Sequence, residues 1–414
     1  MSMLLRLAWR NLGRNKRRTA LTVAAGVFAT VIAVVNLAVG EGSHERWIDH
    51  AVRLYPGHFQ VSVAGYREYR TLDYGLPLDA RAEQALDALP DGARWAPRLE
   101  AFGLISADAD EATGRGVQLF GVDEARERER SKLLGAIDGG RMATPADGAR
   151  EIVLGARLAR NLGVALGESV VVLSTDVYGS QSADRFTVVG TFAVGDDEFD
   201  GYGALVDLGV LQEFLLADGT VSHVAVFLAE SGDLPRVGDE LARAFPPSEY
   251  EVLAWPELMP DLVQFMRLDD IGNWVANAVL IVVVGFGLLN TILMSVFERV
   301  REFGVLRALG LRPRAVFSLV LIESVQLTLL GIAVGFAISI PLVLWLAQHP
   351  IALTGEDMKA TTELFDLEPM IVFALGRHAL VTLPLILIAV GLLSALPPAL
   401  RASRGRPVDA LRAT

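Results

Sequence analysis

Four long apolar runs constrain this chain more than any other feature of its sequence. They cover residues 19–40, 272–297, 315–346 and 379–400. Each run reaches the length of about 20 residues that a helix needs to cross about 30 Å of hydrocarbon. Apolar side chains make up 52% of the whole chain, which is high for a water-soluble protein. The sequence therefore predicts a membrane protein with four transmembrane helices.

Basic residues predict how these spans are oriented. Residues 1–18, the loop 298–314 and the tail 401–414 each carry more Arg and Lys than Asp and Glu. Cytoplasmic segments of membrane proteins have this bias. We therefore expect both termini and the 298–314 loop in the cytoplasm, and the segments 41–271 and 347–378 outside.

The N-terminal region allows two interpretations. Residues 19–40 follow a basic stretch, as the apolar part of a cleaved signal peptide does. The apolar run is longer than the about 7–15 residues of that part, so a retained span is favoured. In residues 1–18, Arg6, Arg10, Arg14 and Arg17 fall on one helical face and apolar side chains on the other. This pattern predicts an interfacial helix lying along the membrane surface.

Segment 41–271 is predicted to be a folded α+β domain. Short runs rich in β-branched residues alternate irregularly with helical patterns. The expected strands are 58–63, 150–155, 169–174, 184–192 and 221–228, and the expected helices are 79–89 and 234–245. The chain's net charge of −12 resides mainly in this segment, which argues against a nucleic-acid partner.

The sequence predicts no catalytic, cofactor-binding or metal-binding residues. Absence of cysteine excludes disulfides, thiolate metal sites and a cysteine nucleophile. None of the three lysines, Lys16, Lys132 and Lys359, follows a glycine, so the chain contains no phosphate-binding P-loop. The acidic run GDDEFDG at 195–201 lacks the alternation and terminal glutamate of an EF-hand, and a solvated turn is favoured.

The charged segment ERVREFGVLRALG at 298–310 separates the second and third spans. It predicts a short cytoplasmic helix with Val300, Phe303, Leu306 and Leu309 along one side and charged residues around the rest. Gly310 is a suitable helix stop and Pro313 a suitable start for the next helix. Apolar groups presented beside charges suggest insertion into a groove on a partner, whereas the alternative is a loop that serves only topology.

This segment, extended to ERVREFGVLRALGLRP, resembles the signature of FtsX/MacB-like ABC transporter permeases. Three further stretches agree with the resemblance: LAWRNLGRNKRRTALT (7–22), LIESVQLTLLGIAVG (321–335) and PPALRASRGRPVDALR (397–412). The resemblance implies the fold of that class, with four transmembrane helices and a large extracytoplasmic domain between the first and second. It implies a permease subunit of the bacterial inner membrane that is not itself an enzyme.

The resemblance also implies partners. A dimeric cytoplasmic ABC ATPase, which binds ATP and Mg, would dock on the 298–314 helix, and a second permease copy or paralogue would complete the transporter. The residues implied in coupling to the ATPase are Glu298, Arg301, Glu302, Phe303, Gly304, Leu306, Arg307 and Gly310.

The outer segment looks like that of the lipoprotein-releasing permeases. The similar stretches are LGARLARNLGVALGESVVVLS and FTVVGTFAVGDDEFDGYGALVDLGVLQEFL. The resemblance implies release of lipoproteins from the inner membrane, with a lipoprotein substrate and a periplasmic chaperone or adaptor as partners. Two alternatives remain: efflux of an amphiphilic small molecule or peptide, and signalling to an extracytoplasmic partner without transport.

Polar and small residues inside the third span form a second set of candidates. Glu323 is an ionisable residue within a span, so it is a candidate for transmission, although pairing with Arg314 or Arg10 or capping a neighbouring helix is favoured. Gly331, Gly335 and Ser339 form a ridge of small residues suited to close helix packing.

Overall fold

The computed structural model describes residues 6–7, 10, 16–90, 92–107, 114–128, 131–145, 149–229, 231–352 and 370–404. The predicted interfacial helix 1–18 lies almost wholly outside the described residues, as do most of the 401–414 tail and the centre of the 347–378 loop. The chain divides into two compact units. A membrane unit comprises Met1–Arg46, Gln264–Leu353 and Met370–Thr414, and an outer unit comprises Trp47–Val263 and Thr354–Pro369.

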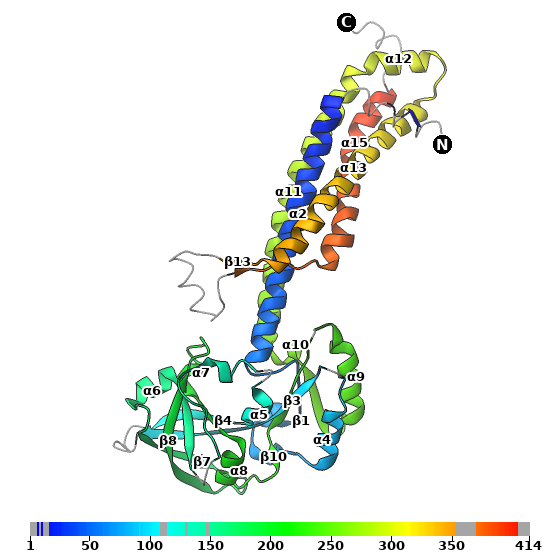
Figure 1. Cartoon of the computed structure of the whole chain (residues 1–414). Helices are drawn as coiled ribbons and strands as arrows, with labels where there is room; N and C mark the ends of the chain where they lie inside the picture. The colour runs from blue at the N-terminus through cyan, green and yellow to red at the C-terminus, as the bar shows by residue number, and fades with distance from the viewer. Residues whose placement is uncertain are drawn as a thin grey trace. The chain divides into compact units, whose positions relative to one another are not determined.

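The membrane unit contains four helices that are long and apolar enough to cross a membrane (Figure 1). They are α2 (Lys16–Leu54), α11 (Pro260–Glu298), α13 (Pro313–Gln348) and α15 (Leu383–Arg404), the last preceded by a π-helical turn at His378–Thr382. The short helix α12 (Val300–Ala308) joins α11 to α13, and strands β13 (Ile351–Ala352) and β14 (Met370–Ile371) pair between α13 and α15. The four predicted spans are therefore present, although α2 continues past residue 40 and α11 begins before residue 272.

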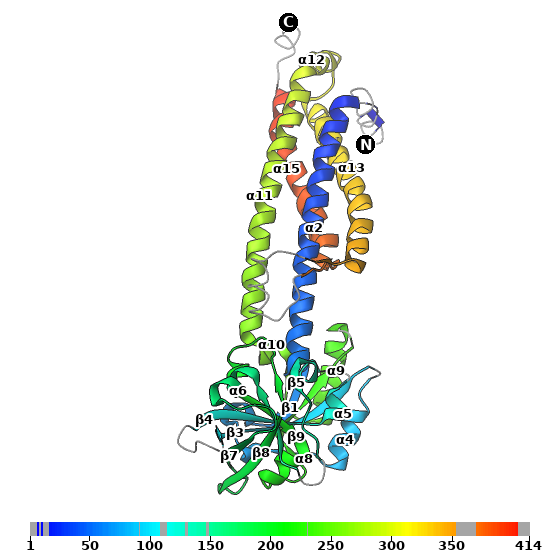
Figure 2. The same ribbon diagram turned by 60° about the vertical axis from the view of Figure 1, so that its left-hand side comes forward.

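Glycines allow the membrane helices to approach closely. A Cβ added at Gly331 of α13 would lie 3.3 Å from the Cα of Gly26 in α2, and one at Gly335 would lie 2.6 Å from the Cβ of Thr30. A Cβ added at Gly391 of α15 would lie 2.5 Å from the Oγ1 of Thr328 in α13. Two views show α13 beside α15 (Figures 1 and 2). Van der Waals contact at small residues is the main attraction between helices in lipid, so these positions fix the packing of the membrane unit.

Six strands of the outer unit close into a ring. Following the pairing, they are β3 (Arg94–Ala107), β4 (Arg115–Val122), β9 (Gly203–Asp207), β6 (Glu151–Gly155), β8 (Gln181–Phe192) and β7 (Ser169–Thr175), which pairs with β3 again. Alternate side chains such as Leu99, Ala101 and Ile105 point inward and fill the ring with apolar groups. The ring is a small barrel whose interior is a packed core.

A second layered part of the outer unit shares strand β3. Strands β12 (Tyr250–Ala254), β1 (Phe59–Val63) and β11 (His223–Phe227) extend the sheet from β3 with antiparallel pairing throughout. Helices α4 (Ala80–Asp87) and α9 (Leu234–Ala244) contribute to the apolar core beside these strands. The outer unit is therefore α+β, as predicted.

Shorter elements complete the outer unit. They are α3 (Tyr66–Tyr69), η1 (Leu72–Tyr74), β2 (Leu76–Pro77), α5 (Glu124–Glu127), η2 (Leu134–Ala136), β5 (Ile137–Gly140), α6 (Ala156–Leu162), α7 (Phe199–Tyr202), α8 (Leu208–Phe214), β10 (Thr220–Val221), η4 (Ser231–Asp233) and α10 (Trp255–Leu258). In the GDDEFDG run, Asp196 accepts hydrogen bonds from the backbone amides of Glu198 and Phe199, and this turn leads into α7.

Candidate functional site

The candidate site lies where α11, α12 and α13 meet. Helix α11 ends at Glu298, and Arg299 has a non-helical backbone (φ −109°, ψ 13°) that separates it from α12. At the other end of α12, Gly310 has φ +94°. Its amide donates to the carbonyl of Arg307, and the amide of Leu311 donates to the carbonyl of Leu306. This is a Schellman ending, in which glycine takes the left-handed conformation, and it sets the turn into α13.

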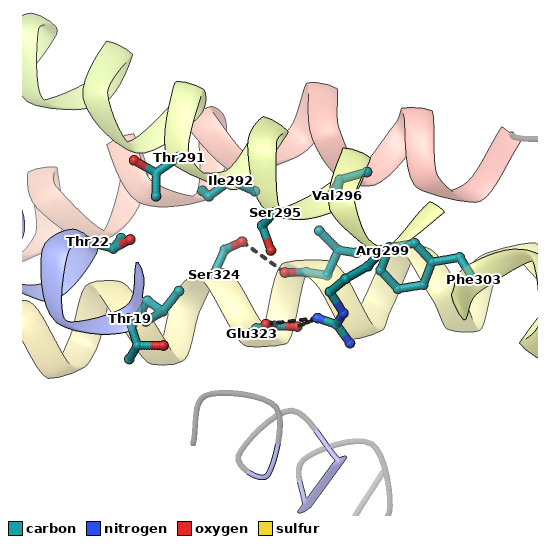
Figure 3. A pocket seen from close by; sticks show the side chains of 12 residues that line it. Thr19, Thr22, Thr291, Ile292, Ser295, Val296, Arg299, Phe303, Glu323 and Ser324 are labelled. Atoms are coloured by element: carbon teal, nitrogen blue, oxygen red, sulfur yellow. Dashed lines mark hydrogen bonds and ion pairs between the residues drawn. The ribbon is translucent and has the colours of Figure 1, made fainter. Parts of the chain in front are cut away.

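Arg299 joins the start of α12 to the interior of α13. Its Nη1 donates to both carboxylate oxygens of Glu323, at 3.1 and 2.9 Å (Figure 3). Its Nε donates to Glu302 at 3.0 Å. The side chains of Arg299 and Glu323 are only 16% and 10% exposed. The expected partners of Glu323, Arg314 and Arg10, were therefore wrong, because the loop folds back and brings Arg299 to the carboxylate.

Hydroxyl groups surround this ion pair. Thr19 and Thr22 of α2, Thr291 and Ser295 of α11 and Ser324 of α13 line a recess beside Arg299 and Glu323 (Figure 3). The recess has a volume of about 20 Å³. That is room for about one water molecule. The arrangement suits a polar joint between helices and is too small to hold a transported substrate.

Helix α12 buries part of the apolar side that was expected to be presented to a partner. Phe303 is 3% exposed and packs with Val296, Val316 and Val320, and Gly304 is buried as well. The expectation that Phe303 is presented to the cytoplasm is therefore wrong. The exposed large apolar residues of this segment are Val305, at 42%, and Leu309, at 80%.

The other predicted coupling residues fall on both sides of α12. Glu298, Arg301 and Gly310 are exposed, whereas Glu302, Leu306 and Arg307 are half-buried. Arg299, which connects α12 to α13, was missed by the sequence analysis. A signal in the sequence could have identified Arg299. It is a basic residue directly after the second span, and the third span contains an acidic residue, Glu323, that needs a partner.

Among the three small residues predicted on α13, two contact α2. Gly331 and Gly335 lie against Gly26 and Thr30, and Ser339 is fully buried. Over the part of the chain that the structure describes, no group of three His, Cys, Asp or Glu side chains is arranged to hold a metal ion.

The outer unit contains a buried polar cluster that the sequence did not indicate. Arg98 and Glu127, both fully buried, form a two-pronged ion pair at 2.7 and 2.9 Å. The Arg98 guanidinium lies 4.3 Å from the ring centre of Tyr55, whose hydroxyl donates to Glu100 at 2.5 Å. Burial, and then the Glu100 carboxylate, raise the pKa of Tyr55 well above its usual value.

His223 belongs to the same cluster. It is 1% exposed and lies opposite Arg98 in the pairing of β11 with β3. Burial lowers the pKa of His223 to about 4, although the nearby Glu100 opposes this shift. The imidazole is therefore neutral at pH 7, and the cluster ties β3, β11, α5 and the segment after α2 together within the outer unit.

Comparison with known proteins gives two matching families. Residues 19–244, more than half of the chain, match the MacB-like periplasmic core domain, and residues 274–407 match the FtsX-like permease C-terminal domain. The lipoprotein-releasing system transmembrane protein LolC of Xylella fastidiosa strain Temecula1 is 26% identical over 95% of this chain and 92% of its own length.

Two further comparisons concern macrolide exporters. The macrolide export ATP-binding/permease protein MacB of Wolinella succinogenes is 26% identical over 81% of this chain but only 52% of its own length. The crystal structure of the periplasmic region of MacB from Actinobacillus actinomycetemcomitans matches 50% of this chain and 92% of that one, with 11% identity and a TM-score of 0.35.

Proposed function

This chain belongs to the family of FtsX-like and MacB-like ABC transporter permeases, and from that premise we propose that it releases lipoproteins from the inner membrane, driven by a separate cytoplasmic ATPase. The family and the four apolar helices indicate a multi-pass protein of the bacterial inner membrane. The observation that carries the proposal is the share of each relative's length that this chain matches. LolC and this chain match over nearly their full lengths, whereas this chain covers only about half of MacB, which carries an ATP-binding part in its name.

In this proposal, α12 docks on the ATPase through its exposed side. Val305 and Leu309 supply apolar contact, and Arg301 supplies charge beside them. Apolar groups on an exposed helix are the usual anchors for a groove on a partner. ATP and Mg bind to the partner, and two ATPase subunits serve two permeases, either two copies of this chain or this chain and a paralogue. Both termini and α12 lie in the cytoplasm.

The Arg299–Glu323 pair transmits the motion. Because it fixes the start of α12 to α13 through buried charges, a displacement of α12 moves α13 with it. Glu302, on α12 itself, holds the same guanidinium. The pair therefore acts as a joint between the docking helix and a transmembrane helix.

Lipoprotein release needs an apolar path for the acyl chains. Moving three acyl chains through water costs on the order of 36 kcal/mol, at about 0.8 kcal/mol for each of about 45 methylenes. Helix α11 exposes a long apolar stripe that suits such a path, made of Val275, Val279, Val282, Val283 and Phe286. The protein part of the lipoprotein, or a periplasmic chaperone or adaptor, is handled by the acidic outer unit, which exposes Phe102, Leu104 and Tyr178.

A pair of photocrosslinker positions tests the substrate. Val283 is 62% exposed and Ile281, on the same helix, is 9% exposed. The purified transporter should crosslink acylated protein from position 283 and not from 281, and ATP should diminish the crosslink. If position 283 gives no lipoprotein crosslink and an amphiphilic drug stimulates ATP hydrolysis, the function is efflux instead. Efflux is the second candidate because of the MacB relative.

A further inference from the structure

An open groove lies beside the first residues of β12 in the outer unit. It has a volume of about 340 Å³, which is much larger than the hydroxyl-lined recess of the membrane unit. The end of α9 contributes Ala242 and Phe245 to the lining, and β12 contributes Tyr250, Glu251 and Val252. Successive side chains of a strand point to opposite faces of its sheet. A groove that touches all three residues of β12 therefore lies at the edge of the sheet.

Strand β12 ends the main sheet, because its only neighbour among the described strands is β1. The amide of Ala64, directly after β1, donates to the carbonyl of Glu249, directly before β12. In an antiparallel pair only every second residue exchanges hydrogen bonds with the neighbouring strand. Counted from Glu249, the residues that direct their backbone groups away from β1 are Tyr250, Val252 and Ala254.

Two of these three residues already use their amides elsewhere. Tyr250 donates to the carbonyl of Pro246, and Ala254 donates to the carboxylate of Glu257 at 3.0 Å. Val252 lies between them, so its amide and its carbonyl both face the groove. Backbone groups at a sheet edge are where an extended segment of another protein adds as a further strand.

Glu251 indicates the chemistry of such a segment. Its Oε2 atom is buried and has no hydrogen-bond partner, and the residue lines the groove. A buried acceptor without a donor is costly, whereas a charged donor supplies a strong hydrogen bond. In an added strand, the residue opposite Val252 shares the face of Val252, and the residues beside it share the face of Glu251. A Lys or Arg in that adjacent position would supply the missing donor.

The charge of β12 argues against a second copy of this chain as the occupant. Residues 246–258 contain Glu249, Glu251 and Glu257 and no Lys, Arg or His. Like charges on neighbouring strands are destabilising, so two copies that paired through β12 would repel each other. The occupant is therefore a different protein that carries the opposite charge.

We propose that the groove and the free edge of β12 bind an extended segment of an extracytoplasmic protein, in which a Lys or Arg stands next to the residue that pairs with Val252. The segment adds one strand to the sheet, and its basic side chain binds the Glu251 carboxylate. The inference goes beyond the proposed function, because it concerns a protein partner of the outer unit whichever substrate the chain releases.

A synthetic peptide tests the groove on the full chain in nanodiscs. The probe is a short fluorescein-labelled peptide of alternating Val and Thr with blocked ends, whose central Thr is replaced by Lys. A second peptide carries Glu in place of that Lys. A third keeps the Lys but is N-methylated at the two Val residues beside it, which removes their backbone donors. Binding is measured by fluorescence anisotropy at physiological salt, since salt screens diffuse attraction between exposed charges.

The Lys peptide should bind the parent chain, and the methylated peptide should not. Glu251→Gln should weaken binding of the Lys peptide by about tenfold or more, the loss expected for one charged hydrogen bond. The matched control is Glu249→Gln, which changes an exposed carboxylate outside the groove and should bind as the parent does. Glu251→Lys should bind the Glu peptide in preference to the Lys peptide. The methylated peptide needs no variant, so it is informative even if a variant fails to fold.

Several results would overturn the inference. Equal weakening by Glu249→Gln and Glu251→Gln would show diffuse attraction to an acidic surface, and normal binding of the methylated peptide would show that no strand is added. Absence of binding by the Lys peptide would also overturn it; if Glu251→Lys then changes the number of chains per assembly, the groove is an interface between copies. Lipoprotein release by the parent chain is assayed separately, so its failure would contradict the proposed function and not the groove.

Discussion

Removing the charge of Glu323 and removing that of Arg299 should have unequal effects on stability. Glu323→Gln leaves the guanidinium with its second partner, Glu302, at 3.0 Å. Arg299→Gln instead leaves the Glu323 carboxylate, which is 10% exposed, with no counter-charge among the described residues of the membrane unit. The asymmetry follows because Arg299 has two acidic neighbours and Glu323 has one cationic neighbour.

The magnitudes follow from this geometry. Loss of a hydrogen bond to a charged group costs about 1.5–3 kcal/mol, which is the expected destabilisation by Glu323→Gln. Loss of one member of a buried pair that leaves the other charge uncompensated costs about 3–5 kcal/mol, which is the expected destabilisation by Arg299→Gln. Replacing both residues with apolar ones of similar size, as in Arg299→Met with Glu323→Leu, should be nearly neutral for stability because neither charge remains buried alone.

Two measurements on the four proteins separate stability from transmission. Thermal unfolding in detergent should rank the parent and the double variant above Glu323→Gln, and Glu323→Gln above Arg299→Gln. Lipoprotein release coupled to ATP hydrolysis should be lost in the double variant despite its restored stability, if the pair is a mechanical joint. Equal destabilisation by the two single variants would refute the geometric reasoning, and normal coupling in the double variant would refute the joint.

Three further predictions follow from other parts of the chain. In the cysteine-free background, Tyr178→Cys should react with an impermeant thiol reagent from outside and Leu309→Cys should not. The reason is that the basic segments predict a cytoplasmic α12. Labelling of both positions from the same side would refute this topology. Gly335→Val should destabilise the membrane unit by about 1–3 kcal/mol, since its Cβ would lie 2.6 Å from the Cβ of Thr30. The control is Gly272→Val, whose Cβ would have no atom within 4 Å, and it should unfold at the parent's temperature in the same thermal assay. Because the pKa of His223 is lowered from 6.5 to about 4, the unfolded chain binds the proton first as pH falls, so the outer unit loses stability from pH 6.5 towards 4. Amide protection factors in the outer unit, which are exchange rates corrected for their intrinsic pH dependence, should therefore fall over this range, and His223→Gln should weaken that fall.

The elements with a strong periodic pattern were predictable from the sequence. The expected strand 169–174 is β7 (Ser169–Thr175), and the expected helix 234–245 is α9 (Leu234–Ala244). The four spans were predictable for the same reason, since hydrocarbon thickness sets their length. The continuation of α2 to Leu54 was not, because residues 41–54 are polar and carry no signal that separates helix from loop.

Strand β3 could not be predicted although it is central to the outer unit. Its sequence, RWAPRLEAFGLISA, contains Pro97 and Gly103, and both residue types are unfavourable in strands. Pairing with β4 begins at Arg98, so Pro97 has a neighbouring strand on only one side, where it lies opposite Val224. Pairing with three neighbouring strands, β11, β4 and β7, makes β3 a strand, and that tertiary effect leaves no local pattern.

The orientation of α12 shows the same limit at the candidate site. Helical periodicity groups Val300, Phe303 and Leu306 on one side, and it cannot say whether that side faces a partner or the protein itself. The structure resolves this because Arg299 bends the chain and directs Phe303 into the core between α11 and α13. Leu309, 80% exposed beside Arg301 and Val305, then remains outside that core. Exposed apolar groups clustered on one short helix commonly mark an interaction surface, so burial of Phe303 transfers the proposed docking role to Leu309 and Val305.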